Sequence, residues 1–249
     1  MSSPEFTIEI SPKVARIWKT FPPLISALLP HSEDAYASPL SEEALIRKLV
    51  EGHSPTILLP TEIRDWPEDQ PLHSDLTPRT PLASGRYQRQ IIDSLTPEQL
   101  CKSVGSHPDA VALKAGLLQL HDDLDASHRS SQSIEGRGRH QAGDYWHAIM
   151  HRREPDYSNS KYWFRHVGEH PIFPQLGQYS ASIATEFNHP QVSDWSLRLQ
   201  QGKNDWNPMT FVDLAQSTAR TPGPLQSFAQ RLQRREMWLL LESTFQDVG

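Results

Sequence analysis

The sequence predicts an all-α or mainly α protein: an irregular multi-helix domain over residues 87–249, preceded by a proline-rich, loop-rich wrap over residues 1–86. Twelve of the 21 prolines lie in residues 1–85, and because proline breaks a helix interior, no long helix is expected there. From about Tyr87 onward, apolar residues recur at helical spacing. Alternating strand patterns are scarce, and Asn-Gly and Asp-Gly hairpin turns are absent from the sequence.

The N-terminal wrap contains one clear helix signal among its prolines. Pro22-Pro23 interrupts the first apolar segment, and further prolines follow at short intervals up to Pro81. A short amphipathic helix is expected over residues 41–51. Ser41 can cap its first turn. The carboxylates of Glu42 and Glu43 stabilise the helix because they lie at the positive, N-terminal end of the helix dipole.

The second part of the chain contains a series of helix starts. Apolar spacing predicts a helix that includes Ile91, Ile92 and Leu95, and Thr96-Pro97-Glu98 marks a second start. The clearest signal is a proline-free run over residues 110–127, which we interpret as one helix. Further helices are expected over residues 143–153, 159–167, 211–219 and 225–245.

Composition narrows the class of function. The 249-residue chain has a formal net charge of −6, which argues against a nucleic-acid or anionic-membrane binder. A single cysteine, Cys101, excludes an intramolecular disulfide and a cysteine-rich zinc module. The N-terminus lacks a signal-peptide pattern and no apolar stretch approaches a membrane span, so we expect a soluble, cytoplasmic protein without a membrane partner.

Seven of the 12 histidines fall within residues 121–170 and suggest a metal site. If residues 110–127 continue as one helix, His121, Asp125 and His128 share its apolar face, within about 60° of one another at about 100° per residue. When imidazole and carboxylate groups are buried, each needs a hydrogen-bond or charge partner, which can be another of these groups, a cation or a residue from elsewhere in the chain. A hydrogen-bonded structural network is the alternative interpretation.

The second candidate lies in the helix expected over residues 143–153. His147 and His151 are four residues apart, the spacing at which two helical histidines chelate one ion. Glu154 follows on the same face and could act as a third ligand, a general base or an arginine partner. Pro155 biases Glu154 away from helical dihedrals, so its carboxylate could leave that face.

Charged and aromatic residues near the histidines suggest a substrate site. Arg152 and Arg153 could clamp a carboxylate or phosphate, or form a solvated charge run. Glu236 lies at the centre of an apolar helical stripe and should therefore pair with an arginine or bind a metal. Candidate substrate-binding residues are Tyr145, Trp146, Tyr162, Trp163 and Arg165.

Three segments of the sequence resemble a group of known sequences. The run from Tyr145 through His151 to Arg165, together with residues 121–128 and 236–241, resembles an uncharacterised family of bacterial and fungal hypothetical proteins. The similarity covers residues 110–245 and implies that these segments form one unit. No activity is established for that family, so the resemblance assigns no catalytic residue.

These observations lead to a functional hypothesis. His121, Asp125, His128, His147 and His151 are candidate ligands for a divalent ion: zinc, iron or manganese. Glu154, Arg152 and Arg153 are candidate catalytic residues of a metal-dependent hydrolase that acts on a small anionic substrate. Oxidation at a non-haem iron centre and a non-enzymatic helical binding module are the alternatives.

Overall fold

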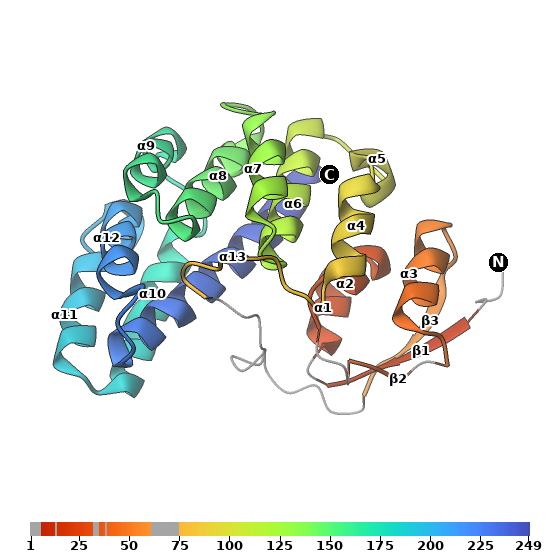
Figure 1. Ribbon diagram of the computed structural model, residues 1–249, viewed down its shortest axis with the longest axis horizontal. Coiled ribbons are helices and arrows are strands. Elements are labelled where there is room, and N and C mark those ends of the chain that lie inside the picture. The colour runs from red at the N-terminus through yellow and green to blue at the C-terminus, as the bar shows by residue number, and fades with distance from the viewer. Residues whose placement is uncertain (1–5, 13, 32–34, 38, 61–74) are drawn as a thin grey trace.

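A computed structural model describes residues 6–12, 14–31, 35–37, 39–60 and 75–249. This part of the chain is mainly helical, as predicted (Figure 1). Its α-helices are α1 (Ala15–Thr20), α2 (Pro23–Leu28), α3 (Glu42–Val50), α4 (Arg86–Ser94), α5 (Pro97–Leu100), α6 (His107–Leu120), α7 (Leu124–Gln132), α8 (Ala142–Arg153), α9 (Tyr157–Val167), α10 (Phe173–Phe187), α11 (Pro190–Leu199), α12 (Pro208–Thr218) and α13 (Pro224–Val248). Two short 3₁₀ helices span Arg139–Gln141 and Lys203–Asp205.

Three strands form a small sheet that the sequence pattern did not predict. The central strand β1 (Phe6–Ile10) pairs antiparallel with β2 (Tyr36–Ala37) and parallel with β3 (Pro55–Leu58). Each strand is too short for a period-two pattern to stand out, and the parallel partner of β1 lies far along the chain. Tertiary pairing therefore decides this sheet.

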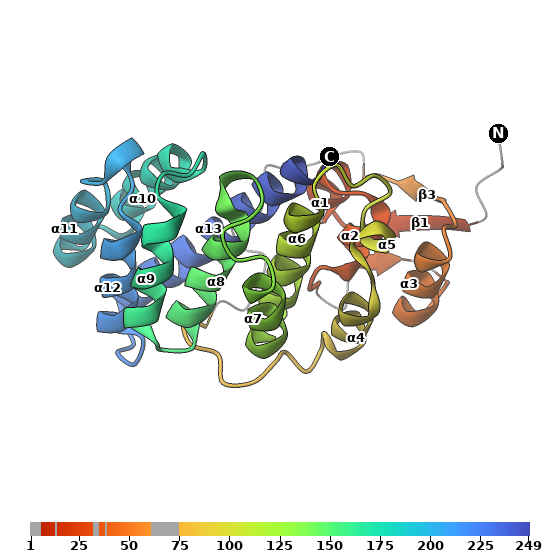
Figure 2. The ribbon, with the colours of Figure 1, turned by 90° about the horizontal axis from the view of Figure 1, so that it is seen from above.

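The helices lie in an elongated array, with the sheet at one end and α10, α11 and α12 at the other (Figures 1 and 2). Helix α8 packs against α7 and α9, and the long helix α13 packs against α6, α10 and α12. A single hydrophobic core includes side chains from the wrap, such as Ile8 and Trp18, and from the helical part, such as Leu113 and Leu240.

Local signals explain several helix boundaries. Ser41 caps α3 as predicted, because its side chain accepts a hydrogen bond from the Ala44 amide at 3.2 Å. Thr96 and Gln99 form a reciprocal capping box at the start of α5. Helices α10 and α11 were not expected from the sequence. Each has a proline in its first turn, where the missing amide hydrogen costs nothing.

The prediction of one helix over residues 110–127 is wrong. Helix α6 ends at Leu120, Asp122 adopts a positive φ of 59°, and α7 begins at Leu124. The Asp123 side chain caps α7 by accepting from the Ala126 amide at 3.1 Å. Arg153 of α8 pairs with Asp122 and donates to the Gln119 carbonyl at 2.7 Å. The pair Asp122-Asp123 is a local signal for this break, because aspartate tolerates a positive φ and caps helices, and a distant arginine stabilises it.

Close packing of α6 against α8 requires glycine at position 116. A β-carbon there would lie 2.5 Å from Cζ2 of the buried Trp146 ring. We expect Gly116→Ala to lower the free energy of unfolding by about 1–3 kcal/mol through overpacking. This loss should exceed the helix-propensity gain of up to about 1 kcal/mol. Urea denaturation measures the difference.

A second variant tests the same steric cause. Combining Gly116→Ala with Trp146→Phe should cost less than the sum of the two single substitutions, because the smaller ring makes room for the methyl group. A Gly116→Ala protein that is more stable than the parent would contradict this account.

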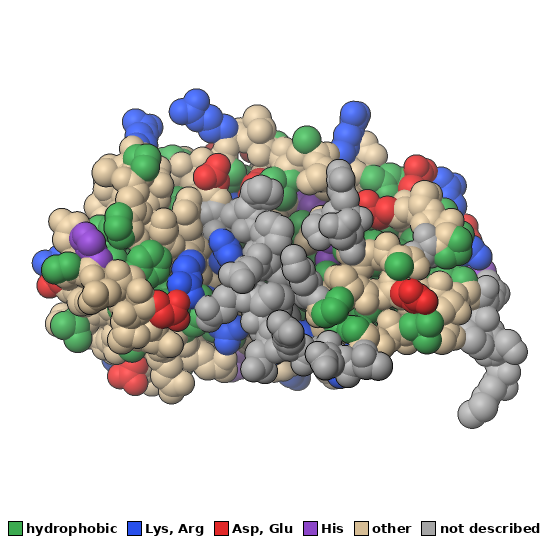
Figure 3. All heavy atoms as spheres, turned by 90° about the horizontal axis from the view of Figure 1, so that it is seen from below, with side chains coloured by type: hydrophobic (Ala, Val, Ile, Leu, Met, Phe, Trp, Pro, Cys, Tyr) green, Lys and Arg blue, Asp and Glu red, His purple; other side chains and the backbone are tan. Residues whose placement is uncertain are grey.

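The surface carries mixed charge on the face seen in Figure 3. There, basic, acidic and apolar side chains of the described residues are interspersed. Among the helices in the described part of the chain, none combines the length and the apolar character that crossing a bilayer would require.

Candidate metal centre

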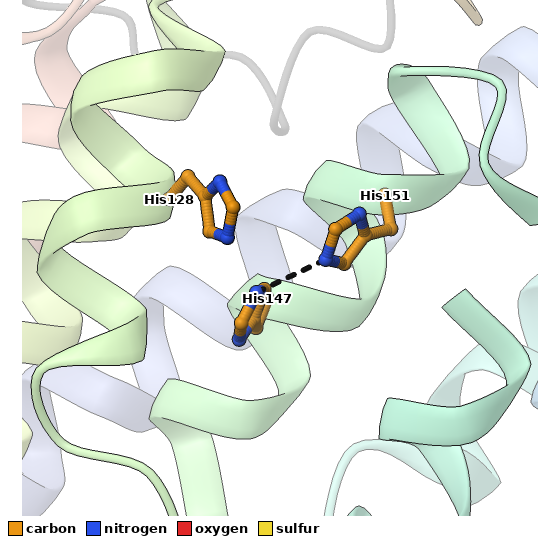
Figure 4. Close-up of side chains that lie close together, drawn as sticks. All are labelled: His128, His147 and His151. Carbon is orange, nitrogen blue, oxygen red and sulfur yellow. Dashed lines mark hydrogen bonds between the residues drawn. The ribbon is translucent and has the colours of Figure 1, made fainter. Parts of the chain in front are cut away.

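Three histidines from two adjacent helices converge (Figure 4). His128 projects from α7, while His147 and His151 project from α8, one turn apart. One ring nitrogen of each lies within 4.8 Å of the others, and the two Nε2 atoms of His147 and His151 are 3.1 Å apart. The His128 ring centroid is 4.7 Å from that of His147 and 5.2 Å from that of His151.

Burial keeps the two α8 histidines neutral. His147 is 1% exposed and His151 is 4% exposed. Desolvation, followed by the nearby histidines, lowers the pKa of His147 to about 3. Desolvation, followed by His128, lowers the pKa of His151 to about 4, against an opposing effect of Asp156. Neutral imidazole is the form that binds a metal ion, so both rings are ready to bind without losing a proton.

Packing and hydrogen bonding orient the histidine rings. The Trp163 ring of α9 stacks on His147, with centroids 4.0 Å apart and an interplanar angle of 26°. The side-chain amide nitrogen of Asn159, Nδ2, lies 3.0 Å from His151 Nε2. Buried His147 Nδ1 has no hydrogen-bond partner within the described part of the chain, so the stacked indole, rather than a hydrogen bond at Nδ1, orients this ring.

Glu154 lies beside this cluster but outside it. It caps the C-terminal end of α8 and is half-exposed, with Oε2 3.5 Å from His151 Nδ1. The two ring nitrogens of an imidazole point in opposite directions. A carboxylate near Nδ1 can therefore orient His151 from behind while Nε2 faces the cluster.

His121 and Asp125 do not join this cluster. Because α6 ends before His121, its ring turns towards α2 and Nε2 donates to the Leu28 carbonyl at 2.7 Å. Asp125 lies in the first turn of α7 and is exposed. The expectation that both share one helix face with His128 is corrected, since it required the continuous helix that the turn at Asp122 interrupts.

Arg152 and Arg153 form internal ion pairs and are not positioned to clamp a substrate. Both side chains are fully buried. Arg152 pairs with Glu236 of α13 and lies over the Phe211 ring, 4.2 Å from its centroid. Arg153 pairs with Asp122. The predicted arginine partner of Glu236 is therefore present, and Asp122, the partner of Arg153, is itself buried.

The candidate substrate-binding residues lie in different environments. Tyr145 is fully buried and donates from its hydroxyl to Glu236 Oε1 at 3.0 Å. Trp146 is also buried and its Nε1 donates to Thr244 Oγ1 at 3.3 Å, so both rings belong to the core. Trp163 contacts the histidines, whereas Tyr162 and Arg165 are exposed.

Sequence reasoning missed the role of Asn159. A signal was present, because Asp156 caps α9 and its side chain accepts from the Asn159 backbone amide at 3.2 Å. That cap places Asn159 in the first turn of α9, the end of this helix nearest to His151 in sequence. Only the packing of α9 on α8 directs its side chain to the histidine.

The arrangement is suited to binding one cation through nitrogen ligands. Three imidazoles leave a fourth coordination position for water or substrate, which is the pattern of catalytic rather than structural zinc sites. Comparisons with protein-family models, curated proteins and solved structures find no match to the chain. The geometry of these side chains is therefore the basis for assigning a function.

Proposed function

We propose that the protein is a metal-dependent enzyme in which His128, His147 and His151 bind one divalent ion. The observation that carries this proposal is the convergence of three imidazole nitrogens within 4.8 Å of one another. In a tetrahedral site with metal–nitrogen distances of about 2.0–2.1 Å, ligand nitrogens lie about 3.3 Å apart. The 3.1 Å between two of these nitrogens already approximates that spacing.

The donor set favours zinc among the candidate metals. Zinc accepts three histidines and retains an open position, whereas non-haem iron oxygenases commonly use two histidines and one carboxylate. Glu154 lies outside the three-histidine cluster, and no other carboxylate among the described residues joins it. A donor set of three histidines without a carboxylate in the described cluster supports hydrolysis over oxidation. Manganese is a weaker candidate than zinc for the bound metal.

The proposed chemistry is hydrolysis by a metal-bound water. A divalent ion can lower the pKa of its bound water to about 7, so that hydroxide is available at neutral pH. Glu154 is half-exposed beside Nδ1 of His151, so its proposed role is to orient that ligand from the side away from the ion, and not to act as the general base expected from the sequence. Of the three arginines considered from the sequence, only Arg165 is exposed, so it is the one that an anionic substrate group can reach.

A structural histidine network is the second candidate. The hydrogen-bond contact between His147 and His151, together with the stacked Trp163 ring, would suit a packed core without a metal. In that case, the chain would be a non-enzymatic helical binding module. Metal binding distinguishes the two candidates directly.

Metal titration of the chelator-treated protein is the first test. We expect calorimetry to show about one equivalent of zinc, and the double variant His147→Ala, His151→Ala to weaken binding by more than about 100-fold. His128→Ala should also weaken binding, because the site needs ligands from both helices. His107→Ala is the control, since this histidine is 62% exposed and outside the cluster. Zinc binding that survives the double variant would contradict the proposed site.

Catalysis needs a separate measurement. We expect the zinc-loaded protein to hydrolyse activated esters or phosphate esters, such as p-nitrophenyl acetate or p-nitrophenyl phosphate, faster than the metal-free protein. Glu154→Gln should lower kcat by about 10–100-fold, the range for loss of a group that orients a metal-binding histidine, while leaving zinc stoichiometry unchanged. Zinc binding without any gain in hydrolysis would support the non-enzymatic alternative.

A further inference from the structure

A second site lies where α2, α3 and α4 meet, at the end of the molecule that carries the small sheet (Figure 1). It is a pocket of about 390 Å³ whose lining shares no residue with the histidine cluster. The lining residues are Pro30, His31, Tyr36, Leu40, Glu42, Leu45, Ser84, Gly85 and Gln88. Three of them are apolar side chains, and Glu42 is the only charged residue at neutral pH among these nine.

The pocket wall has an excess of hydrogen-bond acceptors. His31 Nε2 donates to the Ser26 carbonyl at 2.6 Å, so in the neutral ring Nδ1 carries a lone pair. Burial lowers the pKa of His31 to about 4, which keeps the ring neutral. Gln88 donates its amide nitrogen to Glu42, which leaves its own oxygen as an acceptor. Neither His31 Nδ1 nor Gln88 Oε1 has a hydrogen-bond partner within the described part of the chain.

Two further groups contribute to the polar side of the pocket. The Tyr36 hydroxyl is buried and, within the described residues, has no hydrogen-bond partner. Burial, and then the charge of Glu42, raise the pKa of Tyr36. Burial also raises the pKa of Glu42, against the opposing effect of Gln88. Buried polar groups that lack partners call for a ligand or water to satisfy them.

We infer that this pocket binds a small organic ammonium ion with a short apolar chain. An ammonium group supplies three donors and no acceptor, which matches a wall of lone pairs and one carboxylate. The apolar chain would lie against Pro30, Leu40 and Leu45. A carboxylate or phosphate ligand would instead face Glu42 with no cation in the lining to offset the repulsion.

A matched series of ligands tests the chemistry without altering the protein. Calorimetry with n-pentylamine, n-pentanol and pentanoate compares a cationic, a neutral and an anionic head group on the same chain. We expect saturable binding of pentylamine, binding of pentanol at least about tenfold weaker, and weaker binding still of pentanoate. Equal affinity for the amine and the alcohol, or failure of the amine to bind, would overturn the inference.

A pair of variants tests the location of the site. Glu42→Gln should weaken pentylamine binding by at least about tenfold, as expected when a charge-assisted hydrogen bond is lost. Glu43→Gln makes the same change in net charge on the same helix. Because Glu43 is exposed and pairs with Arg47 at 3.0 Å outside the pocket, this control should bind the amine normally. Equal losses of pentylamine affinity in both variants would show a non-specific charge effect and would contradict the proposed location of the site.

Discussion

Replacing Glu236 with alanine is expected to lower the free energy of unfolding by about 3–5 kcal/mol, which is the usual cost of breaking a buried ion pair from one side. Glu236 is fully buried in α13, where it pairs with Arg152 and accepts from the Tyr145 hydroxyl at 3.0 Å. Its removal leaves the Arg152 guanidinium charged and fully buried with its carboxylate partner gone. Urea denaturation of parent and variant proteins measures this loss.

A second ion pair, at the surface, tests whether the stability cost comes from burial or from the loss of an ion pair alone. Glu186 is about half-exposed and pairs with Arg231 at 2.8 Å. We expect Glu186→Ala to cost less than about 1 kcal/mol, because water and salt screen an exposed pair. The double variant Arg152→Met, Glu236→Leu should recover much of the loss, since no unpaired charge remains. Similar costs for Glu236→Ala and Glu186→Ala would contradict this account.

Acid is expected to destabilise the fold between about pH 6.5 and pH 4, with His121 contributing about 3 kcal/mol. This side chain is fully buried at the end of α6. Desolvation lowers its pKa to about 4, against the opposing hydrogen bond to the Leu28 carbonyl. In this range, the unfolded chain binds a proton that the folded protein excludes. Stability therefore falls as the pH decreases from the unfolded pKa and stops falling below the folded pKa.

His170 should add to this effect in the same direction. It is 2% exposed, and desolvation, followed by His140, lowers its pKa to about 3. Carboxyl groups with raised pKa values, including Asp144 and Glu242, act in the opposite direction because the folded state favours their protonated form. A comparison of variants at several pH values is therefore more informative than the acid midpoint of the parent protein alone.

The His121→Gln variant isolates one contribution to the pH dependence. Glutamine can donate its amide hydrogen to the Leu28 carbonyl but does not titrate. We expect the variant to lose about 3 kcal/mol less stability than the parent between about pH 6.5 and pH 4, by urea denaturation at each pH. Parallel pH profiles for the two proteins would show that His121 is not buried in the neutral form.

Much of the helical content could be predicted from local sequence. The Ser41 cap and the Thr96-Pro97 start lie where α3 and α5 begin, because capping side chains act on amides within the same turn. The spacing of His147 and His151 likewise places both rings on one face of α8. The apolar stripe around Glu236 indicated a buried carboxylate that needs a partner, and Arg152 is that partner.

The errors came from interactions between distant parts of the chain. The break at Asp122 depends on Arg153, which lies 31 residues further along the sequence. Within this proline-free run the pair Asp122-Asp123 is only a weak local sign of such a turn, and the buried arginine partner decides it. The assignment of Arg152 and Arg153 to a substrate clamp failed for the same reason, since exposure is decided by packing and not by charge.

The sequence by itself determined that the chain is mainly helical and that histidines recur on the faces of its helices, because helix caps and the helical period act over a few residues. Only the tertiary structure decided which histidines meet. The turn at Asp122 separates His121 from α7 and leaves His128 opposite His147 and His151, so that α7 and α8 together bring three imidazoles within reach of one ion. Ligand convergence is a property of helix packing, and packing depends on buried contacts across the whole chain.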